Sequence, residues 1–244
     1  MTALCRYALQ LGDDALVLAQ RLAEWCSHAP EIEEDVALAN IALDLLGQAR
    51  SLLAYAAEIE GEGRTEDDFA YGRGERELRN VLLVEHPNGD FAVTMLRQLL
   101  FSSYQLELYG ELARSADDTL AGVAEKAVKE VAYHVDYACE WTLRLGDGTA
   151  YSHERAQAAL DRLWPYTHEL FECDETADAT GVEPSRLRPA WERRVHAVVR
   201  EATLVLPEDG WHPTGGRDGR HTEALGYLLA ELQHLHRAHP GVAW

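Results

Sequence analysis

The sequence is poor in cysteine and in positive charge, and each scarcity excludes a class of protein. Four cysteines are scattered over 244 residues without a Cys-x-x-Cys pair. This spacing argues against a zinc site or a disulfide framework and suits a reducing compartment. The 22 Lys and Arg residues are outnumbered by 42 Asp and Glu residues, so the formal net charge is −20. Such a charge disfavours binding to nucleic acid and to an anionic membrane surface.

Long apolar runs are also missing. No run approaches the roughly 20 residues that span a bilayer. The N-terminus lacks the charged start, apolar core and cleavage site of a signal peptide. We therefore expect a cytoplasmic protein without a membrane partner. No stretch alternates with period two long enough to propose a sheet, and no Gly-x-Ser-x-Gly nucleophile elbow occurs.

Apolar residues recur instead at helical spacing. We predict helices over 3–27, 32–59, 90–113 and 117–145, with further helices near 152–172, 184–204 and 222–238. Gly12-Asp13-Asp14 is expected to bend or restart the first helix, and Pro165 to end or kink the fifth. Asp117 or Asp118 and Thr222 are the expected N-caps of their helices.

The connection between the second and third helices, about residues 61–88, has the length of a crossover. Four long amphipathic helices with one long connection are typical of a ferritin-like bundle. We therefore predict an all-α, ferritin-like up-down helical bundle with a long crossover between helices 2 and 3 and extra C-terminal helices. Residues 1–244 are expected to form a single domain.

Three polar residues interrupt the apolar stripes of the central helices: Gln48, Ser102 and His134. A di-iron carboxylate bundle needs an acid from each of two helices and a Glu-x-x-His pair from each of the other two. Residues three apart lie on one helix face, so each such pair can reach the same metal cluster.

The interruptions do not supply that set. The residues three before Gln48 and His134 are Leu45 and Val131, neither of which can bind a metal. The first helix offers only Glu24, which sits beside its apolar stripe. The positions therefore form a degenerate pocket, too poor in donors and in negative charge for two iron ions.

Several longer motifs carry a resemblance to a known family. They are Leu11-Gly12-Asp13, Glu24-Trp25-Cys26, His28-Ala29-Pro30-Glu31, Leu43-Asp44-Leu45-Leu46-Gly47-Gln48-Ala49-Arg50, Lys129-Glu130 with Tyr133-His134, and His221-Thr222-Glu223. The chain resembles, over nearly its whole length, the C subunits (PaaC) of the phenylacetyl-CoA epoxidases, within the ferritin-like PaaA/PaaC family.

The resemblance implies a related catalytic A subunit that carries the di-iron site. That subunit has Asp-Glu-Ala-Gly-His where this chain has residues 44–48, and Lys-Glu-Glu-x-Phe-His where it has residues 129–134. Glu24 and His134 match retained ligand positions. The lost positions are Leu45, Gln48, Ser102 and Val131.

The implied function is that of a structural subunit. The resemblance predicts no catalytic residue, no metal and no cofactor in this chain, which would not be an enzyme on its own. Its partners would be the di-iron A subunit, the other subunits and the reductase of an oxygen- and NADPH-dependent monooxygenase complex in aerobic phenylacetate degradation. Whether the isolated chain forms a homo-oligomer stays open.

Two other functions stay open beside this one. A self-sufficient di-iron oxygenase would use displaced ligands such as Glu24, Asp44, Glu107, Glu130 and His134. A ferritin-like metal-binding protein would take up iron without a partner. If no metal binds, we expect the polar residues Glu24, Gln48, Ser102 and His134 to form a buried hydrogen-bonded network.

The sequence also indicates two features of the surface. The segment 214–221 places glycines and bases ahead of a helix, as in a phosphate-binding loop, but lacks the lysine-serine or lysine-threonine ending of a P-loop. We interpret it as a flexible surface loop, with a contact to coenzyme A or to the partner as the alternative. Candidate outward residues for docking are Leu16, Leu43, Leu53 and Leu100.

Overall fold

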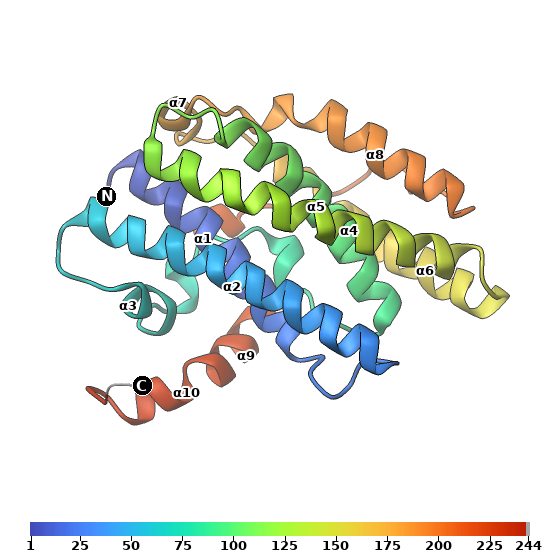
Figure 1. The fold of residues 1–244 in the computed structure, drawn as a ribbon, viewed down its shortest axis with the longest axis horizontal. Coiled ribbons are helices and arrows are strands. Elements are labelled where there is room, and N and C mark those ends of the chain that lie inside the picture. Colours follow the sequence, from blue (N-terminus) through green and yellow to red (C-terminus); the bar gives the residue numbers. More distant parts are fainter. Residues whose placement is uncertain (243–244) are drawn as a thin grey trace. The chain divides into compact units, whose positions relative to one another are not determined.

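The computed structural model describes residues 1–242, and these residues form helices, turns and loops without a β-strand (Figure 1). The all-α prediction is confirmed. The chain divides into two compact units, residues 1–87 with 215–244, and residues 88–214. The single domain spanning 1–244 stays a prediction.

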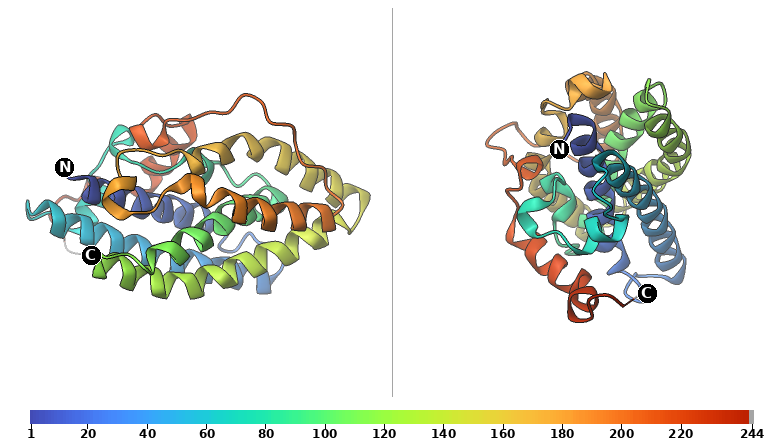
Figure 2. Two further views of the ribbon diagram at one scale, coloured as in Figure 1. Left: turned by 90° about the horizontal axis from the view of Figure 1, so that it is seen from above. Right: turned by 90° about the vertical axis from the view of Figure 1, so that its left-hand side faces the viewer.

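The first unit is built on two long helices, α1 (Ala3–Ala23) and α2 (Ile32–Glu60), which lie side by side (Figures 1 and 2). The Thr2 side chain caps α1 by accepting the Cys5 N–H at 3.2 Å. Gly12 permits the close packing of the pair, because a Cβ at this position would lie 2.8 Å from Leu53 Cδ2. Gly61 ends α2 in the left-handed conformation, with φ of 70°.

The first helix differs from its prediction in two respects. It ends at Ala23 rather than at residue 27, and a turn follows in which Ser27 adopts a positive φ of 66°. It also runs without a break through Gly12-Asp13-Asp14. Both aspartates are buried, and the ion pairs described below hold them inside the protein.

The crossover and the C-terminal segment complete the first unit. The crossover contains α3 (Glu66–Tyr71) and two short 3₁₀ turns, η1 (Glu75–Glu77) and η2 (Leu82–Glu85). The C-terminal segment contains the turn η5 (Gly216–Asp218), α9 (Glu223–Leu232) and α10 (His234–Ala238). The helix predicted over 222–238 is divided at Gln233, whose buried side chain donates to the Ala70 and Arg73 carbonyls at 3.1 and 2.9 Å.

The second unit holds the other pair of long helices, α4 (Phe91–Leu112) and α5 (Asp118–Gly146). Asp90 and Asp117 cap them by accepting N–H groups of the first turn, as the sequence predicts for Asp117. The remaining elements are α6 (Ala150–Leu163), the 3₁₀ segment η3 (Trp164–Phe171), α7 (Ala177–Thr180), η4 (Pro184–Arg186) and α8 (Arg188–Glu201).

For two of these elements the observed bounds differ from the predicted ones. The helix predicted over 152–172 becomes 3₁₀ after Leu163, because Pro165 cannot continue an α-helix. The helix predicted over 184–204 starts only at Arg188. It is fixed to its unit by the buried Trp191, whose Nε1–H donates to the Leu100 carbonyl at 2.8 Å.

The order of elements is that of a ferritin-like chain: a pair of long helices, a long crossover, and a second pair. Within the described residues, α2 is the one helix long and apolar enough to cross a membrane by length and composition. The core helix of a soluble protein meets the same criterion, and one face of α2 is indeed buried in its unit.

Candidate functional site

The degenerate positions of the first unit lie on or next to α1 and α2. Leu45 and Gln48 are buried on one face of α2. Glu24 instead follows the last residue of α1, is exposed, and forms an ion pair with Arg21 at 2.8 Å. The expected buried network is therefore wrong for Glu24, because α1 ends before it can carry this residue into the core.

The degenerate positions of the second unit lie on α4 and α5. Ser102, Val131 and His134 are all buried. The Ser102 hydroxyl donates to the Gln98 carbonyl of the preceding turn at 2.5 Å, so its own helix satisfies it. Val131 offers only a hydrocarbon side chain, and His134 is the one potential metal ligand of the three.

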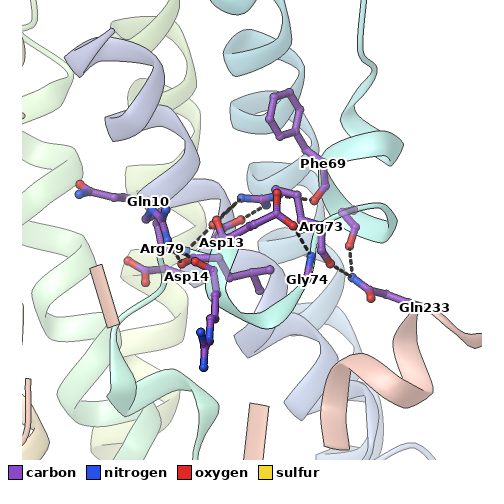
Figure 3. A network of polar contacts seen from close by, with 12 residues as sticks. Gln10, Asp13, Asp14, Phe69, Arg73, Gly74, Arg79 and Gln233 are labelled. Carbon is purple, nitrogen blue, oxygen red and sulfur yellow. Dashed lines mark hydrogen bonds and ion pairs between the residues drawn. The ribbon is translucent and has the colours of Figure 1, made fainter. Parts of the chain in front are cut away.

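A buried ionic network occupies the centre of the first unit (Figure 3). Arg73 forms a bidentate ion pair with Asp13, of which the Nη1–Oδ2 contact is 2.9 Å, and both side chains are buried. Arg73 Nε also donates to the Phe69 carbonyl at 2.6 Å, and the Arg79 backbone N–H donates to Asp13 at 2.8 Å. The network ties α1 to the crossover.

A second buried pair ties the C-terminal segment to α1. Arg217 donates to both oxygens of Asp14, at 3.0 and 2.7 Å, and to the carbonyls of Gln10 and Arg79. Burial raises the pKa of the Asp14 carboxyl from 3.8 to about 6, against the opposing effect of the Arg217 guanidinium.

These contacts correct the interpretation of residues 214–221 as a flexible surface loop. Gly216 is buried, and Arg217 reaches inward to Asp14. The central cation of the loop is already neutralised inside the protein. The exposed Arg220 is paired with Asp218, also exposed, at 3.4 Å. The segment therefore anchors the C-terminal part of the chain to α1. Arg217, the cation at the middle of the segment, is not available to bind the phosphates of coenzyme A.

A third buried pair lies between the crossover and the C-terminal segment. His221 Nδ1 is 3.5 Å from Glu85 Oε2, and its Nε2 is 3.2 Å from the Leu78 carbonyl. Burial opposes the charged imidazole, but Glu85 and Leu78 outweigh it, so the pKa of His221 is raised above 6.5. Burial likewise raises the pKa of Glu85, and the opposing effects of His221, the Thr222 N–H and Arg21 do not cancel it.

The raised pKa of His221 predicts a pH dependence of stability. Folding favours the protonated imidazole, so its contribution is complete below the unfolded pKa of 6.5 and is lost as pH rises through the folded pKa. We expect the urea midpoint of the wild-type chain to fall as pH rises above 6.5, and His221→Gln to flatten this fall. His28→Gln, at an exposed histidine, is the control for the removal of an imidazole from the surface. An unchanged slope in His221→Gln contradicts the assignment.

The candidate docking leucines have different positions from those expected. Leu16, Leu53 and Leu100 are buried, so the expectation that they face outward is wrong. Leu43 is exposed, as expected. For Leu16 and Leu100 the error arises because α1 and α4 are buried on almost every side and have no outer face over much of their length.

Comparison with known proteins identifies the family. The family model described as phenylacetic acid catabolic protein, PaaA_PaaC, matches residues 1–244. The chain belongs to this family. It is 49% identical to the C subunit of the 1,2-phenylacetyl-CoA epoxidase of Escherichia coli (strain K12), over 249 residues that cover the full length of both chains. The resemblance stated from the motifs is confirmed.

The residues of this chain do not fit the di-iron centre that the resemblance implies for the A subunit. At two positions where the resemblance implies glutamates in the A subunit, this chain has Leu45 and Val131, and both are fully buried hydrocarbon side chains. Gln48 offers an uncharged amide instead of an imidazole. An assembly of two iron ions depends on several anionic ligands, which these positions cannot supply.

Three of the five displaced ligands, Glu24, Glu107 and Glu130, are paired with cations. Glu24 and Asp44 belong to the first unit, and Glu107, Glu130 and His134 to the second. Glu107 is paired with Arg194 at 2.7 Å, and Glu130 with Lys126 at 3.3 Å. Among residues 1–242, no three His, Cys, Asp or Glu side chains form a group that could hold a metal ion.

A Glu-x-x-His sequence does occur at Glu231 and His234, away from the predicted positions. Both residues are exposed, and α9 ends between them at Leu232. This pair therefore lacks the continuous helix that would aim both side chains at one metal cluster.

Proposed function

We propose that this chain is the C subunit of a 1,2-phenylacetyl-CoA epoxidase and supports the complex structurally, without a catalytic site or cofactor of its own. The di-iron centre would belong to the catalytic A subunit, which would use oxygen and electrons delivered from NADPH by a separate reductase. The observation that carries the proposal is the pair of buried hydrocarbon side chains, Leu45 and Val131, at two ligand positions. The full-length similarity to an epoxidase component of the same kind supports it.

The charge of the chain supports the same division of labour. Phenylacetyl-CoA is a polyanion, and a surface with formal charge −20 repels it. The loop at 214–221, the candidate phosphate site, has its central arginine buried against Asp14. Substrate binding would accordingly rest with the partner. We further propose that the complex is cytoplasmic, as the reducing environment suggested by four free cysteines would allow.

A self-sufficient di-iron oxygenase is a weaker proposal for this chain. Three of the carboxylates that it needs, Glu24, Glu107 and Glu130, are paired with arginine or lysine side chains. Converting them to iron ligands would break those pairs. It would also leave each cation beside a metal ion of the same charge sign.

Size-exclusion chromatography with the A subunit tests the proposal. A permanent partner is expected to bury about 2,000 Å² or more, so the two chains should co-elute at micromolar concentration and stay together on dilution. A sample of each chain alone is the control for its own elution position. Elution of this chain as a monomer beside an intact A subunit would overturn the proposed function.

A further inference from the structure

Helix α2 is apolar on its outer face as well as on its buried face. Four large apolar side chains are exposed on it: Ile32 (74%), Val36 (56%), Leu43 (63%) and Leu46 (45%). At 100° per residue these four side chains fall within about 80° of one another, so they form one stripe. The inner face of Leu38, Ile41 and Leu45 points away from it. A helix with apolar side chains on two opposite faces is normally covered on both of them.

An apolar groove adjoins this stripe within the first unit. It holds about 350 Å³ and is lined by small and apolar side chains of α1, α2, α3 and α9, among them Ala19, Ala39, Ala42, Leu43, Tyr71 and Leu232. A second hollow of about 240 Å³ shares Leu16, Leu46 and Tyr71 with it. The two hollows therefore form one trough beside the stripe, with room for large apolar side chains of another molecule.

Charge indicates which molecule fits the trough. Exposed acidic side chains accompany both features: Glu33 follows Ile32 at the start of the stripe, and Asp67 lines the second hollow. The nearby Arg50 is already paired with Glu66 at 3.1 Å. A second copy of the chain would bring the same acids together, and an anionic lipid surface or coenzyme A would meet the same repulsion.

We propose that the α2 stripe and the adjoining trough bind an amphipathic helix of the A subunit, with apolar side chains in the trough and Lys or Arg residues facing Glu33 and Asp67. This inference rests on the proposed function. It specifies the face of the molecule through which this chain is held and the chemistry of the helix that it receives.

The cysteines provide a direct footprint of the trough in the unmodified protein. Cys26 is exposed and lines the trough, whereas Cys173 is exposed in the second unit. Cys5 is buried, and burial raises the pKa of Cys139 to about 11, so both react slowly. On adding the A subunit, we expect alkylation of Cys26 by N-ethylmaleimide to slow about tenfold or more, while Cys173 keeps its rate. Equal rates of Cys26 in the free and assembled chain, or equal protection of both thiols, would overturn the inference.

A pair of variants provides the second readout. The double substitution Leu43→Arg with Leu46→Arg places two cations in the stripe without touching the buried face of α2. We expect it to raise the Kd for the partner about 100-fold, while Leu235→Arg, at an exposed leucine of α10, stays within about threefold of the wild type. Unchanged circular dichroism and urea midpoint identify a folded variant. Wild-type affinity of the double variant would overturn the inference.

The outcomes separate this inference from the function on which it rests. If the wild-type chain and the A subunit do not co-elute, the proposed function fails. If they co-elute while Cys26 stays reactive and the double variant binds normally, only the docking face is wrong. Protection of Cys26 by concentrated chain alone, or by phosphatidylcholine vesicles, would show a second copy or a membrane as the occupant and overturn the proposal.

Discussion

Asp13→Ala is expected to lower the free energy of unfolding by about 3–5 kcal/mol, because it leaves the Arg73 guanidinium buried without its counter-charge. The loss is not limited to one pair. The Arg79 N–H also donates to Asp13, and Arg73 holds the Phe69 carbonyl, so α1 and the crossover lose several contacts at once. Urea denaturation followed by far-UV circular dichroism measures the change.

Two further variants test whether the loss of stability comes from leaving a buried charge unpaired. Glu111→Ala removes one side of the exposed Arg114–Glu111 pair and should cost less than about 1 kcal/mol. Replacing both buried partners, with Asp13→Leu and Arg73→Met together, should recover much of the stability lost in Asp13→Ala, because no charge is then left unpaired. If Asp13→Ala costs no more than Glu111→Ala, the network has no structural role.

For a structural subunit, this network bears directly on function. It fixes the crossover and, through Asp14 and Arg217, the C-terminal segment onto α1. α1 in turn packs on α2, which carries the proposed docking stripe. We therefore regard the buried ionic pairs as the means by which the first unit presents a rigid face, rather than as remnants of a reactive centre.

The helices were predictable because their signals are local. The cap at Asp117 and the break at Pro165 depend on a few neighbouring residues, and the structure has them. Thr222 lies at the N-cap position of α9, but its side chain makes no capping hydrogen bond. The uninterrupted course of α1 through Asp13 and Asp14 was not predictable. Its causes are Arg73 and Arg217, which lie 60 and 203 residues further along the chain.

In the candidate site, too, the features that depend on residue type were predictable and those that depend on distant contacts were not. The loss of ligands at Leu45 and Val131 could be read from residue type alone, since a hydrocarbon side chain binds no iron wherever it lies. The position of Glu24 could not, because it depends on where α1 ends. The docking leucines Leu16 and Leu53 were misassigned for a related reason. A helical stripe shows that a face is apolar, but not how many neighbours cover the helix.

The iron content of the isolated chain is the second result with a large expected effect, because a di-iron protein would bind two iron atoms and this chain is expected to bind none. In the second unit Val131 gives His134 no carboxylate on its own helix, and in the first unit Leu45 and Gln48 offer no anionic ligand, so neither unit supplies the carboxylates that two iron ions need. Glu107 and Glu130, the carboxylates of the second unit that could serve as ligands instead, are paired with Arg194 and Lys126. We therefore expect the isolated chain, loaded with Fe(II) without oxygen and then desalted, to retain no stoichiometric iron. His134→Ala should not change its iron content.

The most direct measurement is iron analysis of the separated subunits after co-expression and purification of the complex. We expect two iron atoms per A subunit, with the near-ultraviolet band of an oxo-bridged pair, and neither signal in this chain. Two tightly bound iron atoms in the isolated chain, with that band and with loss of iron in His134→Ala, would contradict it.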